Sequence, residues 1–306
     1  MRKLAFKTLA ASAVAAIFAS GAYAAGVLGP DSDEELVPTG KGWGERAQPG
    51  HAKPNARPST NGINYHGGPL ILGTTNVYYI WYGNWTGNSA TTILTDLATN
   101  VGGSSYFNIN TSYYDGNGAS VSNSVHHAGS TTDNYSRGTA LSDAGIQGVV
   151  SDAISSGRLV KDANAVYFVL TSADVNETSG FCTQYCGWHT HGNIGGDDIK
   201  YSFVGNPDRC PSACEAQPNG PNGNAGADGM ASIISHELEE AVTDPDLNAW
   251  YDRRGEENAD KCAWTFGATY TTSNGSLANM KLGTRDYLIQ RNWVNASGGY
   301  CSLIIQ

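Results

Sequence analysis

The sequence predicts an α/β protein with a single folded domain, in which helices pack on a mixed β-sheet and long loops join the elements. Short β-branched and aromatic runs alternate with three stretches in which apolar residues have helical spacing, a pattern typical of helices that pack on a sheet. The hydrophobic fraction of 40% is sufficient for a core. Six cysteines in the second half of the chain predict that disulfide bonds hold the long loops.

The charge balance excludes several classes of partner. The chain of 306 residues has 18 Lys and Arg against 28 Asp and Glu, which gives a formal charge of −10, and only 15% of its residues are charged. An acidic chain with few cations is unsuited to nucleic-acid phosphates and to anionic membranes. Its 38 glycines follow no three-residue period, which excludes a collagen-like protein.

The first 24 residues have the pattern of a signal peptide. Three cations, a short apolar run from Leu9 to Ser20 and the small-x-small sequence Ala22-Tyr23-Ala24 follow one another. The Ala-rich leader is typical of bacteria, and no later segment has 18 uninterrupted apolar residues. We therefore expect a secreted, extracellular or periplasmic protein without a membrane span.

The segment 25–62 predicts an arm or a pro-segment rather than a folded unit. It has almost no apolar periodicity, and it carries Pro30, Pro38, Pro49, Pro54 and Pro58. We place the folded domain at 63–306.

The first half of this domain predicts a strand, a helix and a turn. Residues 77–82 form a β-branched and aromatic run, which favours a buried strand. Ser89 is placed to cap a helix over 90–101, where apolar residues recur at helical spacing. Asp115-Gly116 and Asn117-Gly118 then favour a tight hairpin turn.

Two further strands and two further helices follow. We expect a helix from Ser142 to about Ser156, strands over 165–170 and 199–204, and a third helix from about Asp228 to Asp244, before Pro245. The intervening stretches 174–198 and 205–227 are predicted to be long loops.

The six cysteines predict three disulfide bonds. Cys182, Cys186, Cys210 and Cys214 have spacings that also suggest a zinc site of four thiolates, but zinc ribbons usually pair cysteines as C-x2-C, and an exported chain is expected to oxidise its thiols. Because six cysteines allow 15 pairings, the connectivity stays open.

The third helix carries a candidate metal motif, His236-Glu237-Leu238-Glu239-Glu240. His236 and Glu240 are one helical turn apart and can bind one ion. Glu237 follows the histidine as in the H-E-x-x-H motif of zinc peptidases, where the glutamate is the general base for a zinc-bound water. We therefore predict a zincin-like active-site helix with Zn²⁺ on His236 and Glu240 and with Glu237 as catalytic base. The alternative is that the three glutamates only form a solvated acidic face.

The acidic sequence after this helix supplies candidates for a third ligand. Nine of the 28 acids lie between Glu237 and Asp260. Asp260 is preferred, because a disulfide at Cys262 can hold it in place. Asp246 has the offset of a metzincin-type ligand but lacks the glycine of that motif, since Thr243 stands there. Glu257 and His189 are the remaining candidates.

His189 and His191 are two further histidines that could take part in the site. We expect them to point to opposite sides of an extended segment, so that both do not bind one ion. One of them is a candidate to stabilise an oxyanion or to orient a substrate. The motifs of serine hydrolases, P-loop nucleotide-binding proteins and dinucleotide-binding proteins are absent from the sequence.

Several segments together resemble the exordium-like, or phosphate-induced protein 1, family of secreted proteins. The matching segments are Tyr65-His66-Gly67-Gly68-Pro69, Val77 to Trp85, Val169 to Val175, Gly180-Phe181-Cys182, Cys186-Gly187-Trp188-His189, Val204-Gly205-Asn206, Cys210-Pro211 with Cys214, and Asp228-Gly229-Met230. The resemblance spans roughly 65–306. It implies an exordium-like domain over 63–306 and, from the plant members, a cell-wall protein linked to growth responses without a settled enzymatic activity.

Two functions follow from these expectations. The first is a secreted zinc hydrolase, most simply a peptidase acting on an extracellular peptide or protein. The plant members are similar on both sides of the third helix but carry small or apolar residues in place of His236, Glu237 and Glu240, which favours an enzymatic role for this chain as a bacterial member. The second is a non-catalytic extracellular or cell-wall protein that binds polysaccharide through aromatics such as Trp43, Trp85 and Trp188.

Overall fold

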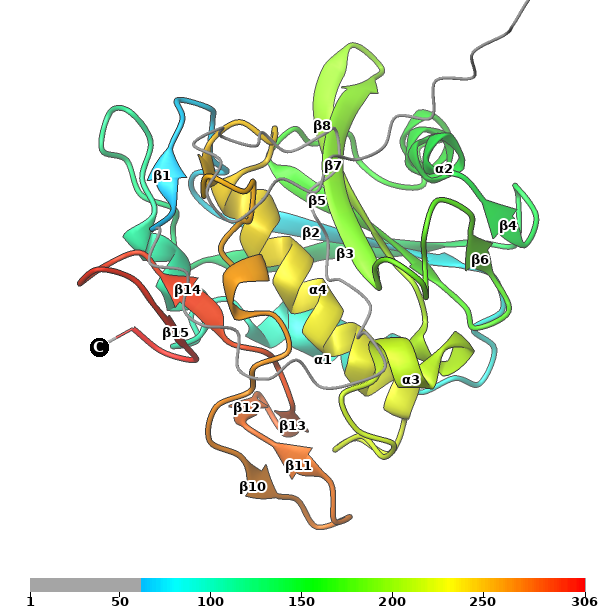
Figure 1. The fold of residues 1–306 in the computed structure, drawn as a ribbon. Coiled ribbons are helices and arrows are strands. Elements are labelled where there is room, and N and C mark those ends of the chain that lie inside the picture. Colours follow the sequence, from blue (N-terminus) through cyan, green and yellow to red (C-terminus); the bar gives the residue numbers. More distant parts are fainter. Residues whose placement is uncertain (1–61, 306) are drawn as a thin grey trace, which may run out of the picture. The chain divides into compact units, whose positions relative to one another are not determined.

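Five strands form the central sheet of the computed structural model, which describes residues 62–305 (Figure 1). They are β2 (Thr75–Tyr82), β3 (Val125–Asp133), β5 (Ala165–Thr171), β7 (Gly187–Ile194) and β8 (Asp197–Val204). Their order across the sheet is β3-β2-β5-β8-β7, in which the first four are parallel and β7 pairs antiparallel with β8. The mixed sheet predicted from the sequence is therefore confirmed.

Helices cover both faces of this sheet. α1 (Ala90–Asn100) and α4 (Ala225–Thr243) pack against each other on one face, where the Tyr79 hydroxyl of β2 donates to the Leu94 carbonyl at 3.2 Å. α2 (Asp143–Ser155) lies on the other face. Successive residues of a strand point to opposite faces of a sheet. The neighbours of Tyr167 in β5 face α1, whereas Tyr167 itself bonds to Val160, just after α2. The described residues all belong to one compact unit.

The remaining elements are short and lie around the sheet. They are β1 (Asn64–Tyr65), β4 (Ala140–Leu141), β6 (Asn176–Glu177), α3 (Pro211–Cys214), β9 (Trp250–Tyr251), β10 (Tyr270–Thr271), β11 (Leu277–Ala278), β12 (Met280–Leu282), β13 (Arg285–Tyr287), β14 (Asn292–Val294), β15 (Tyr300–Ser302), and the 3-10 helices η1 (Phe107–Ser112), η2 (Pro207–Arg209) and η3 (Asp260–Cys262). The strands among them pair as two-stranded ribbons.

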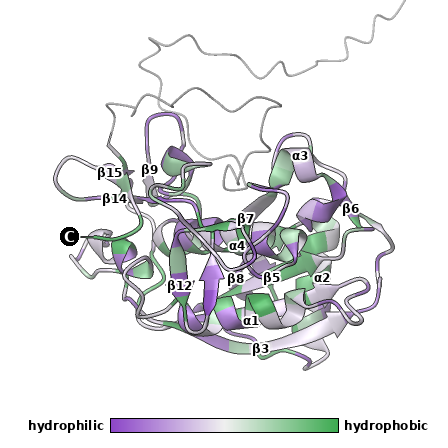
Figure 2. Ribbon diagram, turned by 90° about the horizontal axis from the view of Figure 1, so that it is seen from below, coloured by the Kyte–Doolittle hydropathy of each residue, from purple (hydrophilic) through white to green (hydrophobic). Residues whose placement is uncertain are grey.

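The core lies between the sheet and its helices. All residues of β5 are buried, and hydrophobic stretches are visible at β5 and α1 in Figure 2. Among the described residues, no helix is both long and apolar enough to span a bilayer.

The predicted helices and apolar strands are confirmed with small changes of boundary. α4 begins three residues before Asp228, because the Asn224 side chain accepts from the Ala227 amide at 3.0 Å and caps it. Ser142 caps α2 as expected, by accepting from the Gly145 amide at 3.2 Å. Ser89 precedes α1 without a side-chain cap, and Asn88 instead accepts from the Ala90 amide at 2.9 Å.

Two strands of the sheet lie where the sequence predicted none. β7 falls within 174–198, which was expected to be a loop, so that expectation was wrong. β7 (GWHTHGNI) and β3 (VHHAGSTTD) are rich in Gly, His, Ser and Thr and lack an apolar run. Each forms one edge of the sheet, where a strand has only one neighbour and needs less apolar character.

Three disulfide bonds join the six cysteines, as predicted: Cys182–Cys210, Cys186–Cys214 and Cys262–Cys301. The first two bonds connect the segment before β7 to the segment around α3. Their presence rules out the alternative of a four-thiolate zinc site, since none of the six sulfurs is free. The predicted signal peptide, 1–24, and all but the last residue of the predicted arm lie outside the described residues.

Candidate metal centre

His236 and Glu240 meet on the buried side of α4. The His236 Nε2 and Glu240 Oε1 atoms are 2.9 Å apart, and both side chains are fully buried. Glu237 and Glu239 are also fully buried, so the alternative of a solvated acidic face was wrong. The one-turn spacing therefore brings the imidazole and the carboxylate together, as the motif predicted.

Asp260 completes a group of three with these residues. It begins η3, which runs in the orange segment beside α4 in Figure 1. Its Oδ1 atom is 3.6 Å from His236 Nε2, and its backbone amide donates to Glu240 Oε1 at 3.1 Å. The disulfide at Cys262 links the end of this 3-10 helix to Cys301.

His189 and Glu257 form a second histidine–carboxylate pair on the other side of Glu240. His189 lies on β7, and its Nε2 is 3.2 Å from Glu257 Oε2 and 3.7 Å from Glu240 Oε2. All three side chains are fully buried. The two groups, His236–Glu240–Asp260 and His189–Glu240–Glu257, each bring three potential ligand atoms within 4.8 Å of one another. We call the five residues together the histidine–carboxylate cluster.

Asp246 lies elsewhere. Its Oδ1 is 3.3 Å from Lys200 Nζ and 3.8 Å from His191 Nδ1, and Asp198 bonds to both of these side chains. Lys200 thus supplies a positive charge to this half-exposed group. The structure brings Asp260, not Asp246, to His236.

His189 and His191 lie on the same face of β7, which differs from the expectation of opposite sides. They pair with Ser202 and Lys200 of β8, two residues apart, and side chains two apart in a strand point the same way. The two histidines nevertheless contact different carboxylates, because they lie at different positions along β7. His189 faces Glu240 and Glu257, whereas His191 faces Asp198 and Asp246.

Glu237 faces the beginning of β7. A Cβ atom added to Gly187 would lie 3.1 Å from Glu237 Oε1 and 2.6 Å from the Ile233 side chain. Glycine at 187 therefore permits the close approach of β7 to α4, which also brings His189 to the cluster.

Gln290 is a contributor that the sequence did not reveal. Its side-chain amide contacts His236 Nδ1, so Nε2 is the ring nitrogen that faces Glu240 and Asp260. The same amide accepts from the Trp264 backbone at 2.9 Å. Gln290 is fully buried but lies 54 residues from His236 in sequence, with no motif to connect the two.

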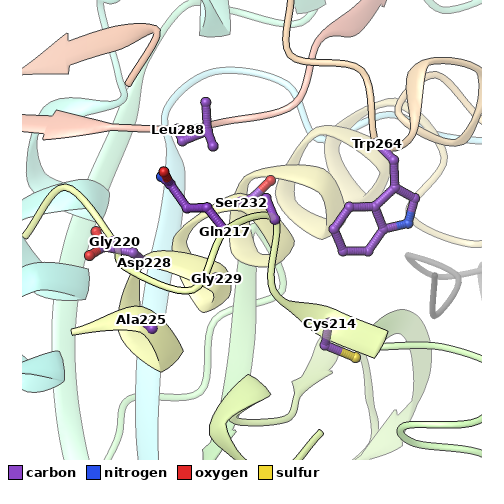
Figure 3. A pocket seen from close by; sticks show the side chains of 10 residues that line it. Cys214, Gln217, Gly220, Ala225, Asp228, Gly229, Ser232, Trp264 and Leu288 are labelled. Atoms are coloured by element: carbon purple, nitrogen blue, oxygen red, sulfur yellow. The ribbon is translucent and has the colours of Figure 1, made fainter. Parts of the chain in front are cut away.

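A pocket lies one helical turn before His236 on α4, at Ser232 (Figure 3). Trp264 and Leu288 line it from the C-terminal segment, and Asp228 lines it from α4. None of the five cluster residues lines this pocket or the other one described, which lies beside Glu177 and the Cys182–Cys210 bond.

Burial shifts the ionisation of the cluster strongly. Burial and the Asp260 carboxylate raise the pKa of Glu240 to about 7, and burial together with Glu240 and Asp244 raises the pKa of Glu257 well above its usual range. Burial lowers the pKa of His189 to about 3. Burial acts in the same direction on His236, but the Glu240 and Asp260 carboxylates hold its pKa well above the usual value. These directions indicate that the cluster contains too little positive charge to balance its carboxylates.

The donor set fits a divalent cation. Within residues 62–305, the ion-pair partners of Glu240, Glu257 and Asp260 are the two histidines. Glu240 Oε2 and Glu257 Oε1 are buried without a hydrogen-bond partner. Buried carboxylates are costly unless they are paired or coordinate a metal, and histidine nitrogen with carboxylate oxygen is a common zinc donor set.

The aromatic residues proposed to bind polysaccharide are not exposed. Trp85 and Trp188 are 7% and 1% exposed, and both pack in the core. That part of the expectation was wrong, because the apolar strands and helices of the domain need large side chains between them. Trp43 lies outside the described residues.

Comparison with known proteins agrees with the resemblance seen in the sequence. A sequence model described as "Phosphate-induced protein 1 conserved region" matches residues 63–290. The chain is 32% identical to protein EXORDIUM-like 5 of Arabidopsis thaliana over 76% of this chain and 75% of that protein, and 31% identical to EXORDIUM-like 3 of the same plant over 78% and 82%. It is 28% identical to protein PHOSPHATE-INDUCED 1 of Nicotiana tabacum over 66% and 70%. No solved structure matches significantly.

Proposed function

The chain belongs to the phosphate-induced protein 1 (exordium) family, and from that premise we propose that it is a non-catalytic extracellular protein whose histidine–carboxylate cluster binds a divalent cation, most simply Zn²⁺. The ion joins α4 to the segment that carries Asp260. The names of the relatives give no enzymatic activity, which supports a non-catalytic role, and the three disulfides support an oxidising, extracellular compartment.

The observation that carries the proposal is the closed burial of the ligands. His236 and Glu240 are fully buried, and Asp260 is 4% exposed. A structural zinc site is closed by its ligands, whereas a catalytic site keeps a position open to substrate. An ion here neutralises buried carboxylates that lie in two segments of the chain, and so links these segments.

Removal of the ion is therefore expected to destabilise the fold. Binding at an ion concentration 100 times Kd contributes about 2.7 kcal/mol, which corresponds to about 5–11 °C in Tm for a domain of this size. Thermal unfolding with and without a chelator, followed by addition of Zn²⁺, measures this change. An equal Tm in all three conditions contradicts the proposal.

A His236→Ala variant distinguishes ion binding in the cluster from weak ion binding at the protein surface. Its Tm is expected to be lower than that of the wild type and independent of the chelator. Asp198→Asn serves as the matched control, since it alters the half-exposed group at His191 and leaves the cluster unchanged. This control is expected to keep the full response to Zn²⁺.

A secreted zinc peptidase remains the second candidate, because Glu237 directly follows the ligand His236 as a general base would. In that case an extracellular peptide is the substrate, and Glu237→Gln lowers the rate of its hydrolysis by about 10²–10⁴ while the bound ion is retained. Assays against a peptide library distinguish the candidates: hydrolysis that is lost in Glu237→Gln favours the peptidase. Binding of cell-wall polysaccharide that survives chelation favours a non-catalytic role.

A further inference from the structure

The cluster has two halves that share one carboxylate. Glu240 directs Oε1 to His236 and Oε2 to His189. Each half has its own imidazole and its own second carboxylate, Asp260 on one side and Glu257 on the other. One carboxylate between two histidine–carboxylate pairs is an arrangement that can bind a bridged pair of metal ions.

The separations between donor atoms fit coordination in both halves. The nitrogen–oxygen distances are 2.9 and 3.6 Å around His236, and 3.2 and 3.7 Å around His189. Bonds of about 2.0–2.1 Å to a tetrahedral zinc ion place neighbouring ligands about 3.3–3.4 Å apart. The second half is therefore as close to coordination geometry as the first.

Buried donor atoms in the second half lack other partners. Glu240 Oε2, Glu257 Oε1 and His189 Nδ1 have no hydrogen-bond partner, and their side chains are at least 99% buried. A single ion at His236 leaves the Glu257 carboxylate with only a histidine beside it. An uncompensated buried charge is costly, so this carboxyl group must either hold a proton or pair with a cation.

We propose that His189, Glu257 and the Oε2 atom of Glu240 form a second divalent-cation position, which Glu240 bridges to the first. This inference rests on the proposed function, since the first ion supplies one side of the bridge. Two divalent cations together balance four of the six carboxylates in this interior, namely those of Glu237, Glu239, Glu240, Asp244, Glu257 and Asp260.

Native mass spectrometry after loading with Zn²⁺ tests the second position. The wild type is expected to retain two ions, and Glu257→Gln and His189→Gln to retain one. Asp246→Asn, which changes the neighbouring half-exposed group, is expected to retain two. Unfolding of each variant is followed by circular dichroism, so that loss of an ion is distinguished from loss of the fold.

The outcomes separate this inference from the proposed function. One ion in the wild type and one in Glu257→Gln overturns the second position and leaves the first intact. One ion in the wild type and none in Glu257→Gln means a single shared site, which also overturns it. No ion in the wild type overturns both proposals.

If Glu257→Gln fails to fold, anomalous diffraction at the zinc absorption edge from the wild type gives the answer instead. Two peaks about 3.5–4 Å apart, on either side of Glu240, support the bridged pair. A single peak contradicts it.

Discussion

At the scale of single residues, the behaviour of His236 depends on which of its two ring nitrogens faces the carboxylates. Nε2 faces Glu240 and Asp260, and the Gln290 amide holds Nδ1. A metal ion on Nε2 leaves the ring hydrogen on Nδ1, and the Gln290 oxygen can accept this hydrogen only if the amide rotates and releases the Trp264 amide. Gln290 is accordingly a positioning residue for the ring.

Replacement of Gln290 tests this role. Gln290→Leu is expected to weaken Zn²⁺ binding by about 10–100-fold, because partners behind a ligand histidine fix its orientation and basicity. Competition with a chromophoric chelator measures the affinity. A loss of Tm that is equal with and without Zn²⁺, at unchanged affinity, would instead show that Gln290 is only a packing residue.

We expect the stability of the ion-free protein to depend on pH because of the buried carboxyl group of Asp244. Burial raises its pKa from 3.8 to about 7, although the Asn248 and Ala249 amides donate to Oδ1 at 2.6 Å each. The folded state therefore holds a proton that the unfolded state releases above about pH 4. Between pH 4 and 7 the unfolded state binds fewer protons, so the free energy of unfolding falls as the pH rises.

The substitution Asp244→Asn keeps an acceptor oxygen and removes this titration. In the presence of chelator, the variant is expected to gain stability relative to the wild type at pH 8 and to gain less at pH 5. Denaturant unfolding at the two pH values measures the difference. A gain of the same size at both contradicts the assignment.

The sequence predicts some residues of the site and not others. His236 and Glu240 are predictable because helical spacing alone brings positions four apart together. Asp260 was the preferred third ligand, and the structure brings it to His236. Gln290 could not be found, since only tertiary packing places it beside the ring.

At the scale of elements, we expect the close approach of η3 to α4 to depend on the Cys262–Cys301 disulfide. This bond ties η3 to β15, and Asp260 is the first residue of η3. Its removal is expected to loosen a ligand of the proposed ion as well as the fold.

A pair of double variants tests this coupling. Cys262→Ser with Cys301→Ser is expected to lose about 2–5 kcal/mol of stability and also affinity for Zn²⁺. Cys182→Ser with Cys210→Ser, at a bond outside the cluster, is expected to lose stability alone. Unfolding curves and chelator competition measure the two quantities, and equal losses of affinity in both variants contradict a specific role.

The elements that the sequence could not predict are the edge strands. Strands β2, β5 and β8 follow from buried β-branched and aromatic runs. β7 has a polar and glycine-containing sequence, and only its pairing with β8 makes it a strand. Because His189 lies on β7, its approach to Glu240 could not be predicted without predicting this strand.

At the scale of the whole molecule, the acidic excess of the chain has a location in the structure. The net charge of −10 says nothing about where the acids lie. Glu237, Glu239, Glu240 and Glu257 are fully buried. A domain with so many interior acids is stable only if protons or cations compensate them.

Family membership and the buried acidic residues support different conclusions about this protein. Similarity over 63–290 assigns the chain to the phosphate-induced protein 1 family. The relatives' names do not mention a metal. The cation is therefore an inference from the buried cluster of this chain, and it must be tested on this protein.

Anomalous diffraction at the zinc absorption edge, from crystals of the protein loaded with Zn²⁺, is the most direct test of that inference. The account predicts a peak about 2.0–2.2 Å from His236 Nε2 and from oxygens of Glu240 and Asp260. A map without a peak inside the cluster, in which His236 Nε2 bonds directly to Glu240, would contradict it.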